Sequence, residues 1–305
     1  MSKHLIIGAG QVGSATALLL AKAGESVLLV SRSGSGPDNA NIEKVAASAA
    51  DRATMLRLSV GASAVYDCAN PAYHRWPSDW PPIASSLLRA AEESNAVLVT
   101  VSNLYGYGPV DHPMTERDEL ASNGVKGRVR AQMWAEAKTA HDSGRVRATE
   151  ARASDFFGPG ERASHFGRMI PRVLAGKTVR VIGNPDTPHS WTYIPDVART
   201  LVTLARDERA WGRPWHVPTN PPLSQRQAVA ALAEQAGVPA PQVRGIPDWV
   251  IQVTGVASPM LRELREVAYQ FERPFVLDSS AATGTFGLEP TPMDEALSAT
   301  LDSQR

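Results

Sequence analysis

The chain has 305 residues, of which 43% are hydrophobic and 20% are charged, and its formal net charge at pH 7 is zero. This composition is typical of a globular protein with a full core, and the balanced charge argues against nucleic acid or a membrane surface as a partner. The single cysteine, Cys68, excludes an intramolecular disulfide and a zinc site made of several cysteines. No apolar run reaches the roughly 18 residues of a membrane-spanning helix. Because the first apolar segment begins at residue 4, we expect no signal peptide and a cytoplasmic protein.

The first predicted elements are a short strand, a glycine-rich turn and a helix. Residues 4–7 are apolar, Gly-Ala-Gly-Gln-Val-Gly follows at 8–13, and residues 14–23 give a helix apolar faces. In this order the G-x-G-x-x-G pattern indicates dinucleotide binding, because the glycines allow a tight turn and the close approach of a pyrophosphate. The N-terminus of the helix offers free N–H groups to the phosphates. We therefore predict cofactor contacts from the turn, at Gly8, Gly10, Gln11, Val12 and Gly13.

The next strand, residues 26–30, indicates which dinucleotide binds. Ser31, Arg32 and Ser33 follow it, with no acidic residue at the place where Asp or Glu usually binds the ribose of NAD. The planar guanidinium of arginine suits a 2′-phosphate. We predict that these three residues bind the adenosine end of the cofactor and that NADP(H) is favoured over NAD(H).

Strands and helices alternate through the rest of the first half. The predicted strands are residues 42–48, 64–69, 96–102 and 147–152, and the predicted helices are residues 51–60, 83–95 and 127–142. Asp51 is expected to cap the first of these helices, and Pro77, Pro81 and Pro82 are expected to interrupt the connection before the second. Ala69 and Asn70, where the strand at 64–69 ends, are assigned to the cofactor site. The alternation is typical of an α/β Rossmann fold, a doubly wound parallel sheet with helices on both faces, and residues 1–155 are assigned to an NAD(P)-binding domain of this kind.

From about residue 155 the pattern changes. A turn is predicted at 157–160, a strand at 178–182, and helices at 166–175, 194–206, 224–236 and 259–269. We expect residues 156–305 to form mainly a smaller α/β substrate-binding region, with some segments returning to the Rossmann sheet. The two regions would then enclose a cleft.

Five motifs occur in a fixed order along the chain. They are the glycine turn at 8–13, Asn-Leu-Tyr-Gly-Tyr-Gly at 103–108, Pro-Met-Thr-Glu at 113–116, Arg-Ala-Ser-Asp-Phe-Phe-Gly-Pro at 152–159 and Trp-Thr-Tyr-Ile-Pro-Asp-Val-Ala at 191–198. Together they resemble the extended short-chain dehydrogenase/reductase superfamily, which includes NAD-dependent epimerases and dehydratases. The resemblance covers almost the whole chain. It implies a Rossmann domain, a small C-terminal substrate domain and, frequently, a homodimer.

The chain departs from this family at the catalytic pair. The family uses Tyr-x-x-x-Lys, in which the tyrosine exchanges a proton with substrate while the lysine lowers the tyrosine pKa and holds the nicotinamide ribose. None of the 6 tyrosines has a lysine four residues later, and the expected place holds Lys126 and Arg130. Arg130 would then hold the ribose, and Lys126, with its pKa lowered by neighbouring cations, would supply the proton. The alternative is that both are solvated cations at the start of a helix.

Tyr105 and Tyr107 are the rival proton donors, because they follow the fifth strand at the edge of the sheet where ligands bind. Tyr105 has an alternative role in packing. Asn103 is assigned to substrate binding, with capping of the turn as its alternative. Asp155 and His189 stand where the resemblance places a sugar-binding asparagine and a diphosphate-binding arginine, so they are substrate-binding candidates that weaken the case for a nucleotide sugar. No histidine spacing indicates a metal site, and no G-x-S-x-G motif indicates a hydrolase.

These observations predict an NADP-dependent oxidoreductase of the atypical extended type, acting on a small-molecule substrate with a carbonyl or hydroxyl group. Two alternatives remain open. One is an NAD(P)-dependent epimerase or dehydratase, which regenerates its cofactor in each cycle. The other is a non-catalytic NADP-binding sensor that lacks the catalytic pair.

Overall fold

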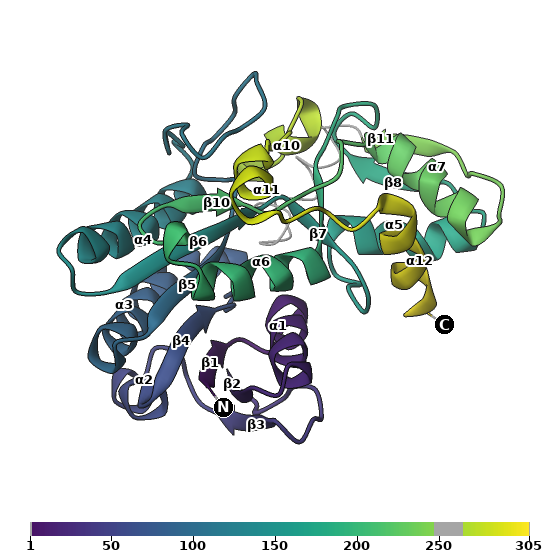
Figure 1. The fold of residues 1–305 in the computed structure, drawn as a ribbon. Coiled ribbons are helices and arrows are strands. Elements are labelled where there is room, and N and C mark those ends of the chain that lie inside the picture. Colours follow the sequence, from purple (N-terminus) through teal and green to yellow (C-terminus); the bar gives the residue numbers. More distant parts are fainter. Residues whose placement is uncertain (1, 247–264, 305) are drawn as a thin grey trace.

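A large parallel sheet forms the centre of the computed structural model, which describes residues 2–246 and 265–304 (Figure 1). Its strands are β1 (Lys3–Ile7), β2 (Ser26–Ser31), β3 (Ile42–Ala46), β4 (Ala62–Asp67), β5 (Val97–Asn103), β6 (Arg147–Ala153) and β10 (Pro214–His216). They are hydrogen-bonded in the order β10-β6-β5-β4-β1-β2-β3, and each neighbouring pair is parallel. The strand order reverses between β1 and β4, which is the place where sheets of this kind bind ligands. The predicted doubly wound α/β fold is confirmed.

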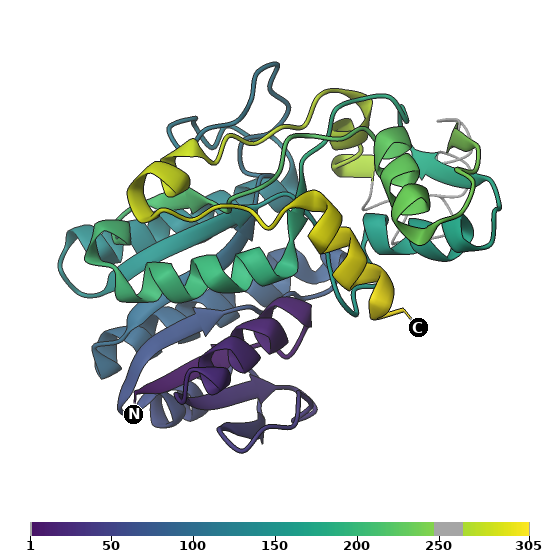
Figure 2. The same cartoon turned by 45° about the vertical axis from the view of Figure 1, so that its right-hand side comes forward.

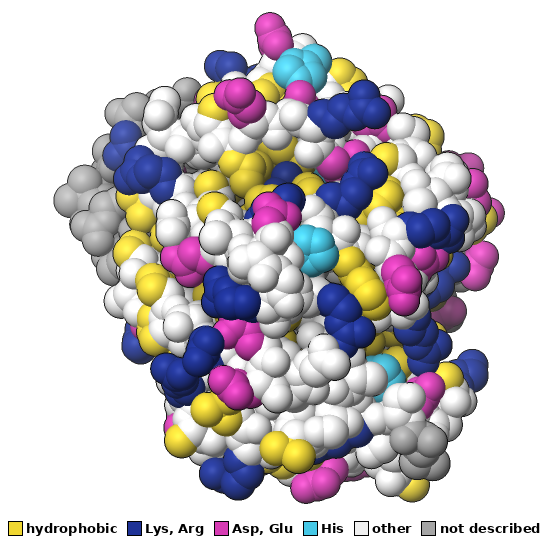
Figure 3. All heavy atoms as spheres, turned by 60° about the vertical axis from the view of Figure 1, so that its left-hand side comes forward, with side chains coloured by type: hydrophobic (Ala, Val, Ile, Leu, Met, Phe, Trp, Pro, Cys, Tyr) yellow, Lys and Arg dark blue, Asp and Glu magenta, His cyan; other side chains and the backbone are white. Residues whose placement is uncertain are grey.

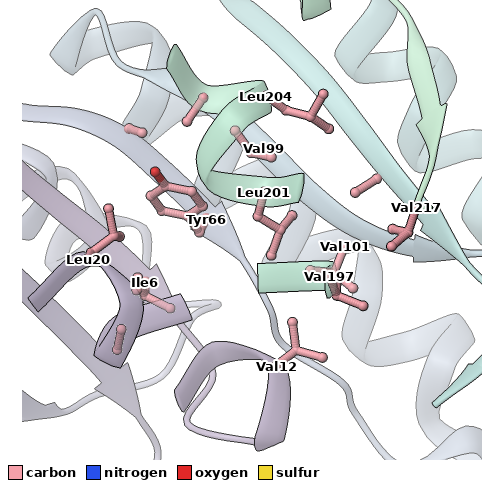
Figure 4. Packing of buried hydrophobic residues seen from close by; sticks show 14 of the residues in the cluster. Ile6, Val12, Leu20, Tyr66, Val99, Val101, Val197, Leu201, Leu204 and Val217 are labelled. Carbon is pink, nitrogen blue, oxygen red and sulfur yellow. The ribbon is translucent and has the colours of Figure 1, made fainter. Parts of the chain in front are cut away.

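Two layers of helices cover the sheet, one on each face. Alternate residues of each strand point to opposite faces and therefore pack against different layers. Ile6, Tyr66 and Val99 pack against α1 (Gln11–Lys22) and α6 (Ile194–Arg206), as Figure 4 shows. The residues immediately before them in the sequence, Leu5, Val65 and Leu98, belong to a core on the other face. That core includes residues of α2 (Arg52–Ser59), α3 (Trp76–Ser94) and α4 (Val125–Asp142). In Figure 2 the purple α1 and the green α6 run side by side across one face.

A smaller region lies beyond the carboxyl ends of the strands (Figure 1). Its two-stranded sheets pair β8 (Val179–Ile182) with β11 (Val243–Ile246), and β7 (Asp155–Phe157) with β9 (Trp191–Tyr193). Its helices are α5 (His165–Leu174), α7 (Gln225–Ala236) and α12 (Met293–Asp302). These elements share a second core that contains Phe166, Trp191, Leu232 and Leu297. Both ends of α7 are capped by residues suited to these positions. Ser224 forms a capping box with Gln227, and Gly237 ends the helix in the left-handed conformation.

The second half of the chain contributes to both regions. Val197 on α6, Trp215 on β10 and Ala282 on α11 (Ser280–Phe286) are buried in the core of the large sheet. The remaining short helices are η1 (Tyr73–Arg75), η2 (Glu208–Ala210) and α10 (Tyr269–Glu272). Most of the helix predicted at 259–269 lies outside the described residues.

The proline-rich segment before residue 83 is helical, so the predicted break there was wrong. Pro77 lies in the first turn of α3, where its missing N–H would have no partner within the helix. Pro81 and Pro82 do remove two N–H groups from the interior of the helix. Trp76 and Trp80 bury their side chains at 1% and 0% exposure, and this packing outweighs the helix-breaking tendency of the prolines.

The surface in Figure 3 shows basic and acidic side chains interspersed, with hydrophobic side chains in small groups. Across residues 2–246 and 265–304, no helix combines the length and the apolarity needed to cross a membrane.

Candidate active site

The glycine turn between β1 and α1 has the backbone shape that a bound pyrophosphate requires. Gly8 has φ +102°, and a Cβ there would lie 2.5 Å from the carbonyl oxygen of Cys68. A Cβ on Gly13 would lie 1.9 Å from the carbonyl oxygen of Gly8, whereas a Cβ on Gly10 would meet nothing within 4 Å. Two glycines are therefore needed for packing, and the third opens onto free space.

Helix α1 begins at this turn without a side-chain cap and without an acidic residue in its first turn. The first N–H groups of a helix have no partner within the helix, and its N-terminus carries a partial positive charge. The turn and the helix together therefore fit an anionic group such as a pyrophosphate.

Two cavities meet at the glycine turn. The outer cavity, of about 470 Å³, is lined by Gly8, Ser31, Arg32, Ser33 and Arg75, among others. The inner cavity, of about 280 Å³, is lined by Gln11, Val12, Ser102, Asn103 and Arg130, among others. Both include Gly10, Cys68, Ala69 and Asn70 in their walls. Together they form a path along the carboxyl edge of the sheet, with Arg32 in the wall of one cavity and Arg130 in the wall of the other.

Arg32 is exposed at the wall of the outer cavity. Serine hydroxyls lie next to it, with Ser31 Oγ 3.1 Å from the carbonyl oxygen of Ser35 and Ser33 Oγ 2.9 Å from Ser35 Oγ. The other arginine of this wall, Arg75, forms an ion pair with Asp79 at 3.0 Å. Arg32 is thus placed to meet a ligand at this end of the path.

Arg130 is a buried cation on the wall of the inner cavity. It is 7% exposed, and its guanidinium carbon lies 4.8 Å from the ring centre of Trp76 and 4.2 Å from that of Trp80. Nη1 donates a hydrogen bond to the carbonyl oxygen of Val101 at 3.2 Å, and Nε has no partner among the described residues. The two aromatic faces stabilise this buried charge.

Lys126 lies one turn before Arg130 on α4 and is 1% exposed. Its Nζ is 2.9 Å from Oε2 of Glu266, and its backbone N–H donates to Oε1 of the same carboxylate at 2.7 Å. The Nζ also lies 5.6 Å from the ring centre of Tyr73. Lys126 is not one of the described residues that line the inner cavity. The structure therefore places it behind the wall, in an ion pair with the C-terminal region.

The two candidate tyrosines of the 103–108 motif lie in different environments. Tyr105 lines the inner cavity, and its hydroxyl is 3.1 Å from that of Tyr73. Tyr107 instead hydrogen-bonds His216 Nε2 at 2.7 Å and accepts from Arg152 at 2.7 Å. Burial raises the pKa of Tyr107 to about 12, although the charge of Arg152 lowers it. Tyr107 belongs to this buried polar cluster rather than to the described wall of the cavity.

Of the three substrate-binding candidates, Asn103 and Asp155 line the inner cavity. Asn103 Oδ1 also accepts the backbone N–H of Tyr105 at 3.1 Å, so it caps the turn. Asp155 Oδ2 lies 3.0 Å from His189 Nε2, although the angles are not those of a hydrogen bond. His189, at 1% exposure, stacks on Phe271 and Phe275. It therefore stands behind Asp155.

Further residues of this wall were not assigned to the site from the sequence: Tyr73, Ser102, Phe156, Glu161, Gln270 and Phe275. Tyr73 follows Asn70-Pro71 closely, so the end of β4 was a signal that could have led to it. Gln270 and Phe275 come from the C-terminal region, where no local pattern relates them to the glycine turn.

A parallel Rossmann sheet, a glycine turn at its switch point and a smaller C-terminal region define the extended short-chain dehydrogenase/reductase architecture. The sequence profile of the NAD dependent epimerase/dehydratase family matches residues 4–217. The chain belongs to this family. None of the curated proteins compared with it matches significantly.

Solved structures agree in fold over almost the whole chain. An epimerase from Methanothermobacter thermautotrophicus has a TM-score of 0.83 at 19% identity, covering 99% of this chain and 91% of that one. UDP-glucose 4-epimerase from Thermotoga maritima, solved with UDP-glucose, has a TM-score of 0.81 at 19% identity, covering 99% and 98%. UDP-glucuronic acid 4-epimerase from Bacillus cereus, solved with UDP-glucuronic acid and NAD, has a TM-score of 0.78 at 17% identity, covering 99% and 98%.

Proposed function

We propose that this protein is an NADP(H)-dependent oxidoreductase that acts on a small carbonyl or hydroxyl compound. The observation that carries the proposal is the uncapped N-terminus of α1 at a glycine turn that opens onto two connected cavities. When bound, the nicotinamide cofactor supplies or accepts a hydride. The residues of this chain bind the cofactor, orient it and handle the proton.

The preference for NADP(H) is supported by the outer cavity. Arg32 is exposed there beside Ser31 and Ser33, and no acidic residue stands at the end of β2 to bind a ribose diol. A guanidinium forms paired hydrogen bonds with a phosphate, and neighbouring hydroxyls can add further donors. Arg32 is therefore proposed to hold the 2′-phosphate of NADP(H).

Arg130 is proposed to hold the nicotinamide ribose at the inner cavity. It occupies the place of the family's lysine on α4, and it lines the inner cavity. Because the guanidinium packs against the rings of Trp76 and Trp80, it can orient a ribose with little loss of side-chain freedom on binding.

The size of the inner cavity supports a small substrate. About 280 Å³ lies at the lower limit of ordinary ligand sites, and the nicotinamide must share this space. The wall includes the aromatic residues Tyr73, Trp76, Phe156 and Phe275, while Asp155 and Asn103 provide polar contacts. These features favour a compact, partly apolar compound.

An epimerase acting on a nucleotide sugar is the second candidate. Its support is the family itself and the similar fold of UDP-glucose 4-epimerase and UDP-glucuronic acid 4-epimerase. The two candidates differ in the fate of the cofactor, because a reductase consumes NADPH and an epimerase regenerates its cofactor in each cycle.

The test is to follow NADPH absorbance during incubation with aldehydes, ketones and quinones, and to follow UDP-glucose by proton NMR in a parallel sample. The proposal predicts stoichiometric NADPH consumption with at least one carbonyl compound and no change in UDP-glucose. Conversion of UDP-glucose without net cofactor consumption would establish the epimerase instead.

A further inference from the structure

Two tyrosines line the inner cavity, although the family's tyrosine is missing from α4. Tyr73 comes from η1, just after β4, and Tyr105 comes from the turn after β5. Their hydroxyl oxygens lie 3.1 Å apart, within hydrogen-bond distance. The same cavity is lined by Gly10, Ser102 and Arg130. Two tyrosine hydroxyls from other elements thus lie near the place where the family's tyrosine on α4 would meet the substrate.

The surroundings of the pair fix Tyr73 in place. Its ring packs edge-on against Trp76, with ring centres 5.1 Å apart, and Trp76 in turn stacks on the Arg130 guanidinium. The Lys126 ammonium lies 5.6 Å from the Tyr73 ring centre. The two cations that replace the family's pair on α4 therefore lie against neighbouring aromatic rings, Lys126 against Tyr73 and Arg130 against Trp76.

We propose that Tyr73 is the residue that exchanges a proton with the substrate oxygen, and that Tyr105 positions it. The inference rests on the proposed function. Tyr105 is 6% exposed, and its hydroxyl lies within hydrogen-bond distance of the Tyr73 hydroxyl. Tyr73 is the less buried of the two, so its hydroxyl can accept from Tyr105 and still donate to a ligand.

The charges around Tyr73 suit this role. Burial raises the pKa of Tyr73, and Asp155 also raises it, while the hydrogen bond with Tyr105 and the charge of Arg130 lower it. Tyr73 therefore stays protonated at neutral pH and is available as an acid. Burial also raises the pKa of Tyr105, well above its ordinary value, with Gln270 opposing the shift. Tyr105 thus remains a hydrogen-bond donor.

The proton step balances as follows. In carbonyl reduction, the Tyr73 O–H bond breaks and its proton forms the new O–H bond of the alcohol, while the substrate carbon receives the hydride. NADPH is oxidised and the carbonyl group is reduced. The Tyr73 phenolate, stabilised by Tyr105 and Arg130, regains a proton from solvent, and alcohol oxidation runs through the same steps in reverse.

The test uses protein labelled with ¹³C at the phenol carbon of its 6 tyrosines. Loss of one resonance in Tyr73→Phe assigns Tyr73, and its titration is followed with and without saturating NADP⁺. The oxidised nicotinamide carries a positive charge, so we expect the Tyr73 titration to move down by about one pH unit or more. Tyr107, held by Arg152 and His216, is the internal control and should titrate alike in both samples.

Three outcomes are informative. Tryptophan fluorescence that shows NADP⁺ binding, together with an unmoved Tyr73 titration, overturns the role of Tyr73 and leaves the proposed function standing. Absence of NADP⁺ binding overturns both proposals. A downward shift supports the role of Tyr73 as the proton donor.

The variant Tyr105→Phe tests the positioning role. It should raise the pH at which Tyr73 titrates, because the lost hydrogen bond had lowered the pKa of Tyr73. An unchanged Tyr73 titration in Tyr105→Phe would reject the positioning role.

An activity measurement completes the test, using a carbonyl compound that the wild-type protein reduces with NADPH. Tyr73→Phe should lower kcat by about 10²-fold or more and leave the Kd of NADPH within about threefold. A kcat equal to that of the wild type would overturn the assignment.

Discussion

At the scale of single residues, two glycines of the turn have different roles: Gly13 is needed for packing, and Gly10 faces the space where a ligand would bind. A Cβ at position 13 would overlap the Gly8 carbonyl oxygen, whereas a Cβ at position 10 would enter open space at the junction of the two cavities. Substitutions at these two positions should therefore have opposite consequences.

Gly10→Ala should change the free energy of unfolding by no more than about 0.5 kcal/mol and weaken NADP⁺ binding about tenfold or more, since its methyl group occupies the path of the pyrophosphate. Gly13→Ala is the matched comparison and should destabilise the protein by about 3 kcal/mol or more through overpacking. Urea unfolding and NADP⁺ titration of both variants measure the contrast. A Gly10→Ala variant that binds NADP⁺ normally would contradict the assigned pyrophosphate site.

Asp67 gives a pH-dependent contribution to stability. Burial raises its pKa to about 6, although the charge of Arg130 opposes the shift. Because the folded-state pKa lies above the unfolded value, the folded protein binds the proton more strongly. The protonated Asp67 therefore contributes up to about 3 kcal/mol to the free energy of unfolding. This contribution is full below about pH 4 and is lost as the pH rises through about 6.

Asp67→Asn removes this titration, because an amide of similar shape stays neutral. We expect the stability of the variant relative to the wild type to increase as the pH rises from about 4 to 7, measured by urea unfolding at several pH values. A constant difference across this range would show that Asp67 does not titrate there.

At the scale of elements, a carboxylate from the C-terminal region binds the N-terminus of α4. Glu266 accepts the backbone N–H of Lys126 and pairs with its Nζ, 140 residues away in sequence. A carboxylate at a helix N-terminus also interacts favourably with the helix dipole. This contact joins α4, which carries Arg130, to the segment that carries Gln270.

Glu266→Ala should destabilise the protein by about 1–3 kcal/mol, because it removes a carboxylate that pairs with a buried ammonium and accepts a hydrogen bond from a backbone N–H. Lys126→Met in the same background should recover part of that loss, since the buried charge is then gone as well. A double-mutant cycle on unfolding free energies measures the coupling. Additive effects of the two substitutions would mean that the ion pair contributes nothing to stability.

At the scale of the whole molecule, the sequence predicts what is local and misses what tertiary contacts create. The glycine turn, the cap at Asp51 and the alternation of strands and helices depend on neighbouring residues, and the structure contains them. The proline-containing part of α3 was missed because buried tryptophans, not local preference, stabilise it.

In the candidate site too, the sequence predicts the local features and misses the tertiary contacts. Arg32 and the glycine turn adjoin predicted strands, so the sequence could place them at the edge of the sheet. The Tyr73–Tyr105 hydrogen bond and the Lys126–Glu266 ion pair join residues 32 and 140 positions apart. No periodicity or motif relates such residues, and only the folded chain shows which tyrosine faces the cavity and which cation is fixed behind it.

The proposed cofactor site is the path along the carboxyl edge of the sheet, where Arg32 would hold the 2′-phosphate of NADP(H). The most direct test is calorimetric titration of the wild type, Arg32→Ala and the control Arg244→Ala with NADP⁺ and with NAD⁺. Arg244 is an exposed arginine of β11, in the smaller region.

We expect the wild type to bind NADP⁺ about tenfold or more tightly than NAD⁺. Arg32→Ala should lose about 10- to 100-fold in NADP⁺ affinity, as expected for about 1.5–3 kcal/mol from a hydrogen bond to a charged group, and keep its NAD⁺ affinity. Arg244→Ala should match the wild type with both cofactors. Equal or tighter binding of NAD⁺ by the wild type would contradict the account.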